Sequence, residues 1–310
     1  MDMPDSIAAI ADQLAAGGPV VAAPELFAGR EVFLAELGRL LLRPWMAADH
    51  VSRLRQDGEW FRCDAANRSI VIVRENARSI HALRNICLHA GYRICEEEDG
   101  RAERLLCRYH GWEYALDGLL TEPLLRPQQT DRSRFRLPRY ALRICRGLIF
   151  IDPSAAAPPS EPLLPEPALD PSGIAAELEA FEVTRRQRYA TNWNWKHVRQ
   201  FLLSSPGLFD PGAGAGMGFV ELGPLSLLLA GPDRAVLLRI IPKFPGHTDF
   251  DMIRMAAPGA AADENGPDRV AEALRRAGDI IAAAPETALD RDFFSWYWPL
   301  ISASATDAAS

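Results

Sequence analysis

Four potential metal ligands fall within one short segment of the sequence, as two close pairs. One residue separates Cys87 from His89, and two residues separate Cys107 from His110. The seventeen residues between the pairs are long enough to run out and back as a hairpin, which would bring the second pair beside the first. This spacing predicts a metal site built from two adjacent tight loops.

The mixture of thiol and imidazole within each pair narrows the kind of site. A Rieske [2Fe–2S] centre uses two cysteines on one iron and two histidines on the other, which is the ligand set present here. Zinc sites with two cysteines and two histidines pair like residues with like, so they fit poorly, and chance spacing is the remaining alternative. Gly91 and Gly111 would let the backbone approach the cluster sulfides. The other cysteines, Cys63, Cys95 and Cys145, are interpreted as small buried apolar residues.

The overall charge and hydropathy argue against several classes of function. The 310 residues are 48% hydrophobic and 24% charged, enough to bury a core without disulfides. A formal charge of −7 argues against a broad basic face for nucleic acid. The sequence has no apolar run of roughly 18 residues to cross a membrane, and its N-terminus lacks the positive region of a secretory signal. We therefore expect a cytoplasmic protein with five reduced cysteines, bound to neither membrane nor nucleic acid.

Changes in pattern along the chain predict four parts. Residues 1–45 form a lead-in, with a helix from about residue 25, that packs on the C-terminal domain. Short strand-like runs between turn residues make 46–152 a small antiparallel β domain, which contains the Cys/His segment. Residues 153–172 are proline-rich and are predicted to form an extended linker. Residues 173–310 then form an α+β domain, an antiparallel sheet with helices packed against it.

Within this last part the apolar patterns locate particular elements. Strands are expected over 218–230, 235–242 and 248–257. A helix is expected from about 267 to 284, because apolar residues recur there on one stripe. The aromatic run at 293–298 is expected to contact the core or another subunit.

The Cys/His segment reads Cys87-Leu88-His89-Ala90-Gly91-Tyr92 and then Cys107-Arg108-Tyr109-His110-Gly111-Trp112. These motifs, with Asn194-Trp195-Lys196 further on, resemble the large (alpha) subunit of the Rieske non-haem iron oxygenase family. The resemblance implies an α+β fold, in which a Rieske all-β domain precedes an antiparallel-sheet domain of helix-grip type. It also implies a [2Fe–2S] cluster held by Cys87, His89, Cys107 and His110.

One contrast favours the oxygenase type of Rieske protein. Rieske proteins of respiratory complexes carry an extra cysteine in each loop, and the two form a disulfide. Tyr92 and Tyr109 stand at these positions here, so no such disulfide can form. Trp112 stands where the respiratory type has a hydroxyl donor, and fewer hydrogen bonds to sulfur lower the reduction potential.

The resemblance also implies a mononuclear Fe(II) bound by two histidines and a carboxylate. In the family an acid and then the two histidines follow the Asn-Trp-Lys motif. The acid would fall on Ser204 or Ser205, and the histidines on Gly207 or Leu208 and on Gly212 or Ala213. Asp290 and Asp292 lie where the carboxylate ligand is expected. Because none of the other positions carries an imidazole or a carboxylate, we predict that this iron site is degenerate and that the chain lacks mononuclear Fe(II).

Three functions remain open. The leading one is an iron–sulfur electron-transfer subunit without catalytic residues of its own. It would work in a trimer or hexamer ring with a homologous iron-bearing catalytic subunit, and receive electrons from a ferredoxin or flavin reductase. The second is a complete monooxygenase or dioxygenase, for hydroxylation or demethylation, with an unusual iron site from His197, His247 and an acid. The third is a redox-sensing or ligand-binding scaffold.

Overall fold

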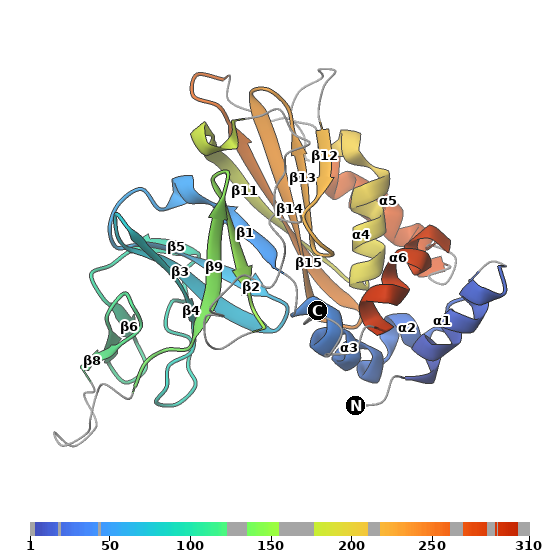
Figure 1. Ribbon diagram of the computed structural model, residues 1–310, viewed down its shortest axis with the longest axis horizontal. Coiled ribbons are helices and arrows are strands. Elements are labelled where there is room, and N and C mark those ends of the chain that lie inside the picture. Colours follow the sequence, from blue (N-terminus) through green and yellow to red (C-terminus); the bar gives the residue numbers. More distant parts are fainter. Residues whose placement is uncertain are drawn as a thin grey trace.

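Two lobes make up the computed structural model, one of short strands from residues 45–154 and one with a sheet covered by helices from the N-terminal and C-terminal parts of the chain (Figure 1). The structure describes residues 4–17, 20–42, 45–122, 135–154, 177–209, 218–260, 269–283, 289 and 291–302. The predicted α+β order, an all-β domain followed by an antiparallel sheet with helices, is confirmed. Of the predicted linker 153–172, residues 155–172 lie outside the described residues. No helix in the described ranges is long and apolar enough to span a membrane.

A seven-stranded antiparallel sheet forms the body of the first lobe, in the order β1-β10-β9-β4-β3-β2-β5. Its strands are β1 (Met46–His50), β2 (Glu59–Ala65), β3 (Arg68–Asn76), β4 (Ser79–Arg84), β5 (Asp99–Arg101), β9 (Arg139–Cys145) and β10 (Leu148–Asp152). A smaller sheet extends from it, made of β6 (Leu105–Cys107), β7 (Trp112–Tyr114) and β8 (Leu120–Glu122). This smaller sheet, with half of the Cys/His segment, lies at the end of the lobe (Figure 1).

The N-terminal residues form helical elements beside the last helix of the chain (Figure 1). They are α1 (Asp5–Ala15), α2 (Glu25–Ala28), α3 (Arg30–Glu36) and the π-helical turn η1 (Leu37–Leu41). The prediction of one helix from about residue 25 to 45 is therefore wrong. Gly29 separates α2 from α3, and a Cβ atom there would lie 2.4 Å from the Glu25 carbonyl oxygen. Only glycine allows the chain to turn so close to the preceding helix.

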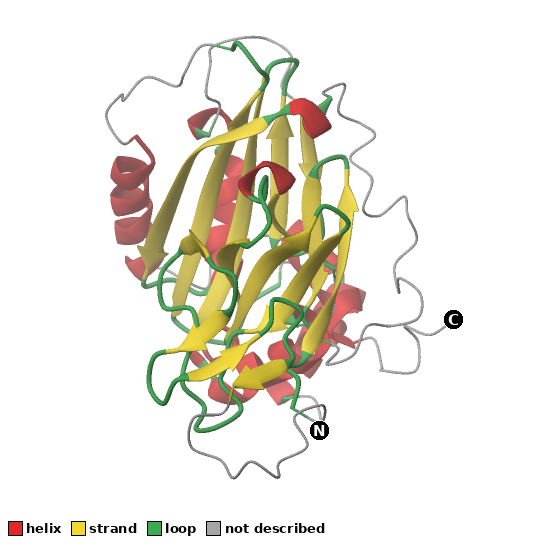
Figure 2. Ribbon diagram, turned by 90° about the vertical axis from the view of Figure 1, so that its left-hand side faces the viewer, coloured by secondary structure: helices red, strands yellow, loops and turns green. Residues whose placement is uncertain are grey.

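The second lobe is a five-stranded antiparallel sheet with helices on one face (Figures 1 and 2). Its order is β11 (Glu182–Thr191), β15 (His247–Ala256), β14 (Arg234–Phe244), β13 (Ser226–Ala230) and β12 (Gly218–Glu221). The helical elements are η5 (Leu178–Ala180), α4 (Trp195–Ser204), η6 (Pro206–Leu208), α5 (Arg269–Ala283) and α6 (Arg291–Ser302). The predicted strand 218–230 is two strands, because Gly223, with φ +97°, and Pro224 form a turn between β12 and β13.

Both faces of this second sheet are buried, which explains its almost uninterrupted apolar strands. On one face, Leu228, Leu237 and Ile253 cluster with Trp45 and Phe150 of the first lobe. Neighbouring residues on the same strands point to the other face and cluster with α4 and α6. The sheet therefore joins the two lobes through one face and supports the helices on the other.

Candidate metal centre

Two tight loops carry the four predicted ligands. In the second loop, Cys107 and Trp112 are paired across β6 and β7, and the Gly111 N–H donates to the Cys107 carbonyl at 2.9 Å. The first loop repeats this bond, since the Gly91 N–H donates to the Cys87 carbonyl at 3.0 Å. The two glycines have φ values of +74° and +68°, a conformation that other residues rarely adopt. Each glycine thus closes a turn of the same form behind a cysteine.

The loops bring the four side chains together inside the small domain. The ring centroids of His89 and His110 are 4.6 Å apart. Cys87 and Cys107 are 3% and 2% exposed, and both belong to the core of this domain. Burial, reinforced by the Cys87 thiol beside it, raises the pKa of the Cys107 thiol. Iron would displace that proton, because a coordinating thiol is deprotonated.

The histidine nitrogens test whether the site fits a cluster. Nδ1 of His89 and Nδ1 of His110 are buried and have no hydrogen-bond partner among the described residues. A buried ring nitrogen without a partner is unfavourable unless a ligand such as a metal satisfies it. Within the described ranges, no three His, Cys, Asp or Glu side chains surround a single point. A binuclear cluster does not need such a point, because each iron takes only two protein ligands. The donor set therefore fits a [2Fe–2S] cluster.

Two aromatic residues of β7 complete the interior of the site. The Trp112 ring stacks on His89, with centroids 5.0 Å apart, and is fully buried. The Tyr114 hydroxyl accepts the Leu88 N–H at 3.0 Å and lies 3.3 Å from Cys87 Sγ. Burial and the Cys87 thiol raise the pKa of Tyr114, so the hydroxyl keeps its proton. The sequence analysis did not identify Tyr114 as a donor. Its spacing could have suggested it, because Tyr114 is two residues from Trp112 on one strand and such residues share a face.

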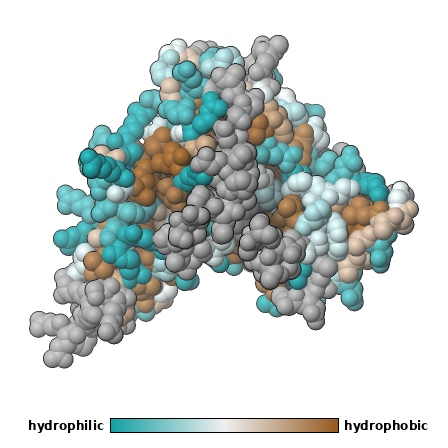
Figure 3. Space-filling model, viewed as in Figure 1, coloured by the Kyte–Doolittle hydropathy of each residue, from teal (hydrophilic) through white to brown (hydrophobic). Residues whose placement is uncertain are grey.

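The outer side of the site is aromatic and exposed. Tyr92 and Tyr109 stack with centroids 3.7 Å apart and are 47% and 51% exposed. These are the positions at which the respiratory type has its disulfide, and they are indeed adjacent in space. Tyr109 also lies 3.8 Å from the His110 ring. On the face shown in Figure 3, patches of apolar residues are visible on both lobes.

Comparison with known proteins agrees with this geometry. Residues 44–134 match the Rieske [2Fe-2S] domain family. The chain contains a Rieske domain. It is 28% identical over 130 residues to benzene 1,2-dioxygenase subunit alpha of Pseudomonas putida, covering 41% of this chain and 29% of that protein. It is 26% identical over 234 residues to biphenyl 2,3-dioxygenase subunit alpha of Rhodococcus jostii, covering 72% of this chain and 48% of that protein. The chain is therefore homologous to Rieske oxygenase alpha subunits, and its matches span less than half the length of these relatives.

Solved structures share the fold of both lobes. A quaternary ammonium Rieske monooxygenase, CntA, aligns with a TM-score of 0.69 over 97% of this chain and 98% of its own, at 16% identity. Another structure of a quaternary ammonium Rieske monooxygenase, described with inter-subunit electron transfer, aligns with a TM-score of 0.71 over 97% of this chain and 99% of its own, at 16% identity. Naphthalene 1,2-dioxygenase aligns with a TM-score of 0.56 over 82% of this chain, at 17% identity. These similarities confirm a Rieske domain followed by an antiparallel-sheet domain.

The Asn194-Trp195-Lys196 motif ties the second domain to the N-terminal helices. The Asn194 side chain caps α4 by accepting the Lys196 N–H at 3.0 Å. The buried Lys196 ammonium lies 2.6 Å from the Glu36 carboxylate, which also accepts the Trp195 Nε1–H at 2.9 Å. The Tyr297 hydroxyl donates to the same carboxylate at 2.7 Å. A buried charge is tolerated only when it is paired and hydrogen-bonded in this way, so the motif has a structural role here.

The positions expected to form the mononuclear iron site of the Rieske oxygenases follow α4. The described positions of the expected acid and histidines carry no imidazole or carboxylate and are Ser204, Ser205, Gly207 and Leu208. Gly212, Ala213 and Asp290 lie outside the described residues. The carboxylate of Asp292 belongs to an exposed residue in the first turn of α6.

The two remaining histidines of the second domain have separate surroundings. His197 is 3% exposed and stacks on the Phe27 ring at 4.6 Å. His247, in the β14–β15 hairpin, lies 3.3 Å from Asn192 Oδ1 and 3.6 Å from the Asp249 carboxylate. In the part of the chain that the structure describes, neither joins a group of three ligating side chains. The described residues therefore do not form an iron site from these two histidines and an acid.

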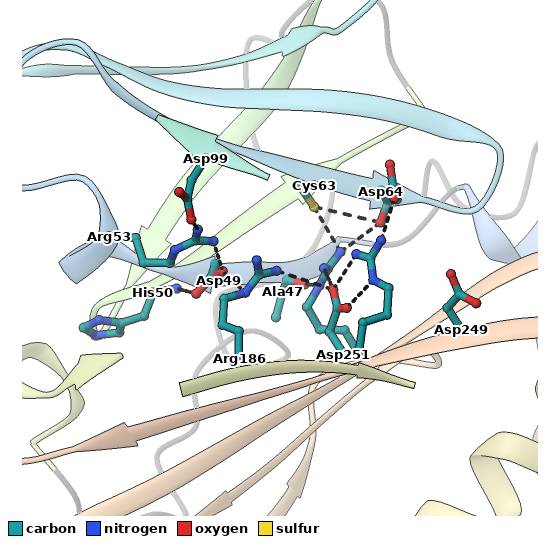
Figure 4. A network of polar contacts seen from close by, with 12 residues as sticks. Ala47, Asp49, His50, Arg53, Cys63, Asp64, Asp99, Arg186, Asp249 and Asp251 are labelled. Carbon is teal, nitrogen blue, oxygen red and sulfur yellow. Dashed lines mark hydrogen bonds and ion pairs between the residues drawn. The ribbon is translucent and has the colours of Figure 1, made fainter. Parts of the chain in front are cut away.

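A buried network of charged residues lies where the Rieske domain meets the second sheet (Figure 4). Arg239, 2% exposed, donates to the Ala47 carbonyl at 2.7 Å, to Asp251 at 2.9 Å and to Cys63 Sγ at 3.0 Å. Burial alone would raise the pKa of Asp251, but Arg188 and Arg239 hold it below its usual value. Burial raises the pKa of the Cys63 thiol, so Cys63 is a neutral member of the network. These contacts fix β2 of the Rieske domain against β14 and β15.

Proposed function

We propose that this chain is the electron-transfer subunit of a Rieske oxygenase system. Cys87 and Cys107 would hold one iron of a [2Fe–2S] cluster, and His89 and His110 would hold the other through Nδ1. The observation that carries this assignment is two buried, unpartnered Nδ1 atoms beside two buried cysteines. When bound, such a cluster accepts and releases one electron at a time.

The surrounding residues have defined roles in this proposal. Trp112 covers His89 and excludes water, while the Tyr114 hydroxyl is placed to donate to Cys87 Sγ. Hydrogen bonds to a ligand sulfur stabilise the reduced form and raise the reduction potential. Tyr109 is 51% exposed and its ring contacts that of the partly exposed His110, so the His110 side of the site offers a short route for an electron to leave.

The proposal further places the O₂-activating Fe(II) in a homologous catalytic subunit rather than in this chain. It is supported by Gly207 and Leu208 at one expected ligand position and by the separate surroundings of His197 and His247. The chain would then join the catalytic subunit in a trimer or hexamer ring and receive electrons from a ferredoxin or flavin reductase.

A complete monooxygenase or dioxygenase is the second candidate. It is favoured by the alignment with the monooxygenase CntA over 97% of this chain. In that case Fe(II) would bind this chain, and the chain alone would oxidise a substrate.

Metal analysis combined with turnover separates the two candidates. The full chain, purified without oxygen, should contain about two irons and about two sulfides and show no O₂ consumption when only a reductase is added. Cys107→Ser should lose the cluster, whereas Cys145→Ser, a matched change in the same domain, should keep it. A content near three irons together with substrate oxidation by this chain alone would support the complete oxygenase instead.

A further inference from the structure

A cavity of about 880 Å³ lies between the Rieske domain and the second domain. One wall comes from the turn between β2 and β3, the end of β4 and the residues next to the first cluster loop. The opposite wall is the hairpin of β14 and β15. The volume is within the range of sites that bind small molecules, about 300–1,000 Å³. None of the cluster ligands and none of the described residues at the expected iron-site positions lines this cavity, whereas His247 does.

The wall from the Rieske domain is basic. Arg68, Arg84 and Arg93 all line the cavity. Arg84 and Arg93 are exposed, and neither has an ion pair or a side-chain hydrogen bond among the described residues. Arg68 donates to the Pro153 carbonyl and lies over the Tyr140 ring at 5.8 Å. It too has no carboxylate partner in the described part of the chain. Three guanidinium groups therefore share one cavity, and none of them has a carboxylate partner among the described residues.

The acidic residues of the cavity are already neutralised. Asp64 pairs with Arg188 at 3.0 Å and with Lys243 at 3.3 Å. Asp249 lies 3.9 Å from the same Lys243 ammonium. Lysine and arginine residues lower the pKa of Asp64 against the effect of its burial, so it stays ionised and engaged. Among the described lining residues the unbalanced charge is positive, although the whole chain has a formal charge of −7.

Apolar surface lies beside these cations. The Phe244 side chain is 68% exposed at the hairpin, and Ile86, Pro138 and Tyr140 line the opposite side. A free inorganic anion would leave this surface in contact with water. An anionic group attached to an apolar body would satisfy both the arginines and the apolar walls.

We propose that this interdomain cavity binds an organic anion, a carboxylate or phosphate on an apolar body, with Arg84 and Arg93 as its main contacts. The site is additional to the proposed electron transfer and does not depend on it. Arginine suits this role because its planar guanidinium can form two parallel hydrogen bonds to a carboxylate or a phosphate.

The test is calorimetric titration of the full, cluster-loaded chain with benzoate, phenyl phosphate and the uncharged benzamide. At least one of the two anions should bind saturably, and benzamide should not. Tighter binding of benzoate would indicate a carboxylate ligand, and tighter binding of phenyl phosphate would indicate a phosphate ligand. Arg84→Gln and Arg93→Gln should each weaken that binding about tenfold or more, as expected for the loss of a charge-assisted hydrogen bond. Arg78→Gln, an exposed change of the same charge in the β3–β4 turn, should leave it unchanged.

Three results would overturn the proposal. One is the absence of saturable binding by both anions, and a second is that Arg78→Gln weakens anion binding as much as the other variants do, which would indicate only a general charge effect. The third is that Arg84→Gln and Arg93→Gln slow electron uptake from an acidic ferredoxin while no small anion binds. The arginines would then form a docking surface for a protein. Because cluster content and reduction by dithionite are measured on the same samples, a failure of the electron-transfer proposal is seen separately.

Discussion

Replacing Tyr114 with phenylalanine should lower the reduction potential of the bound cluster. The Tyr114 hydroxyl accepts the Leu88 N–H at 3.0 Å, so its own proton is free to point to Cys87 Sγ at 3.3 Å. A hydrogen bond to a charged acceptor contributes roughly 1.5–3 kcal/mol. Reduction adds one negative charge to the cluster, and a strengthening of this bond by about 1 kcal/mol corresponds to roughly 40 mV for one electron. The variant should therefore have a potential lower by about 40 mV.

Potentiometric titration followed by electron paramagnetic resonance of the reduced cluster measures this shift. Tyr92→Phe is the matched control, because Tyr92 is 47% exposed and stacks on Tyr109 instead of contacting a cysteine. An unchanged potential in Tyr114→Phe would refute the assignment of this hydroxyl as a donor to sulfur. An equal fall in both variants would refute it as well, since the effect would not be specific to the Cys87 contact.

Three further changes test the fold around the site. Lys196→Met leaves the buried Glu36 carboxylate without a counter-charge and should lower the free energy of unfolding, measured in urea, by about 3–5 kcal/mol. The double variant that also carries Glu36→Gln should recover part of this loss. Arg239→Met removes four buried hydrogen bonds and should lower the Tm by several degrees, at roughly 2–4 °C per kcal/mol. Burial lowers the pKa of His50 below 6.5, so the unfolded chain binds a proton that the folded chain does not. The Tm should therefore fall as the pH drops below about 6.5, and His50→Gln should reduce this fall.

The cluster segment was predictable because its information is local. Each Cys/His pair lies on one tight loop, as predicted. The intervening residues do not form the predicted hairpin, because β5 pairs with β2 and β6 pairs with β7. Gly91 and Gly111 were singled out for the approach of the backbone to the cluster, and the structure shows that each closes a tight turn at positive φ. Tyr114 was not predicted, because a tyrosine in a strand is as common in a core as beside a ligand, and only the distance to Cys87 distinguishes the two.

Contacts between distant parts of the chain were not predictable in this way. The Arg239–Ala47 hydrogen bond joins residues 192 positions apart, and Lys196 meets the Leu26 carbonyl across 170 positions. Nothing in the local pattern of either segment specifies its partner. For the same reason Asn194-Trp195-Lys196 could be matched to a family motif, while its contacts with Glu36 became visible only in the folded chain.

The most direct test of the central claim is a combined count of iron and acid-labile sulfide in the full chain and its ligand variants. We expect about two irons and two sulfides per chain. His89→Ala and His110→Ala should each abolish the spectrum of the reduced cluster, and His247→Ala should leave both counts unchanged. Iron bound without sulfide, or a third iron lost in His247→Ala, would contradict the account.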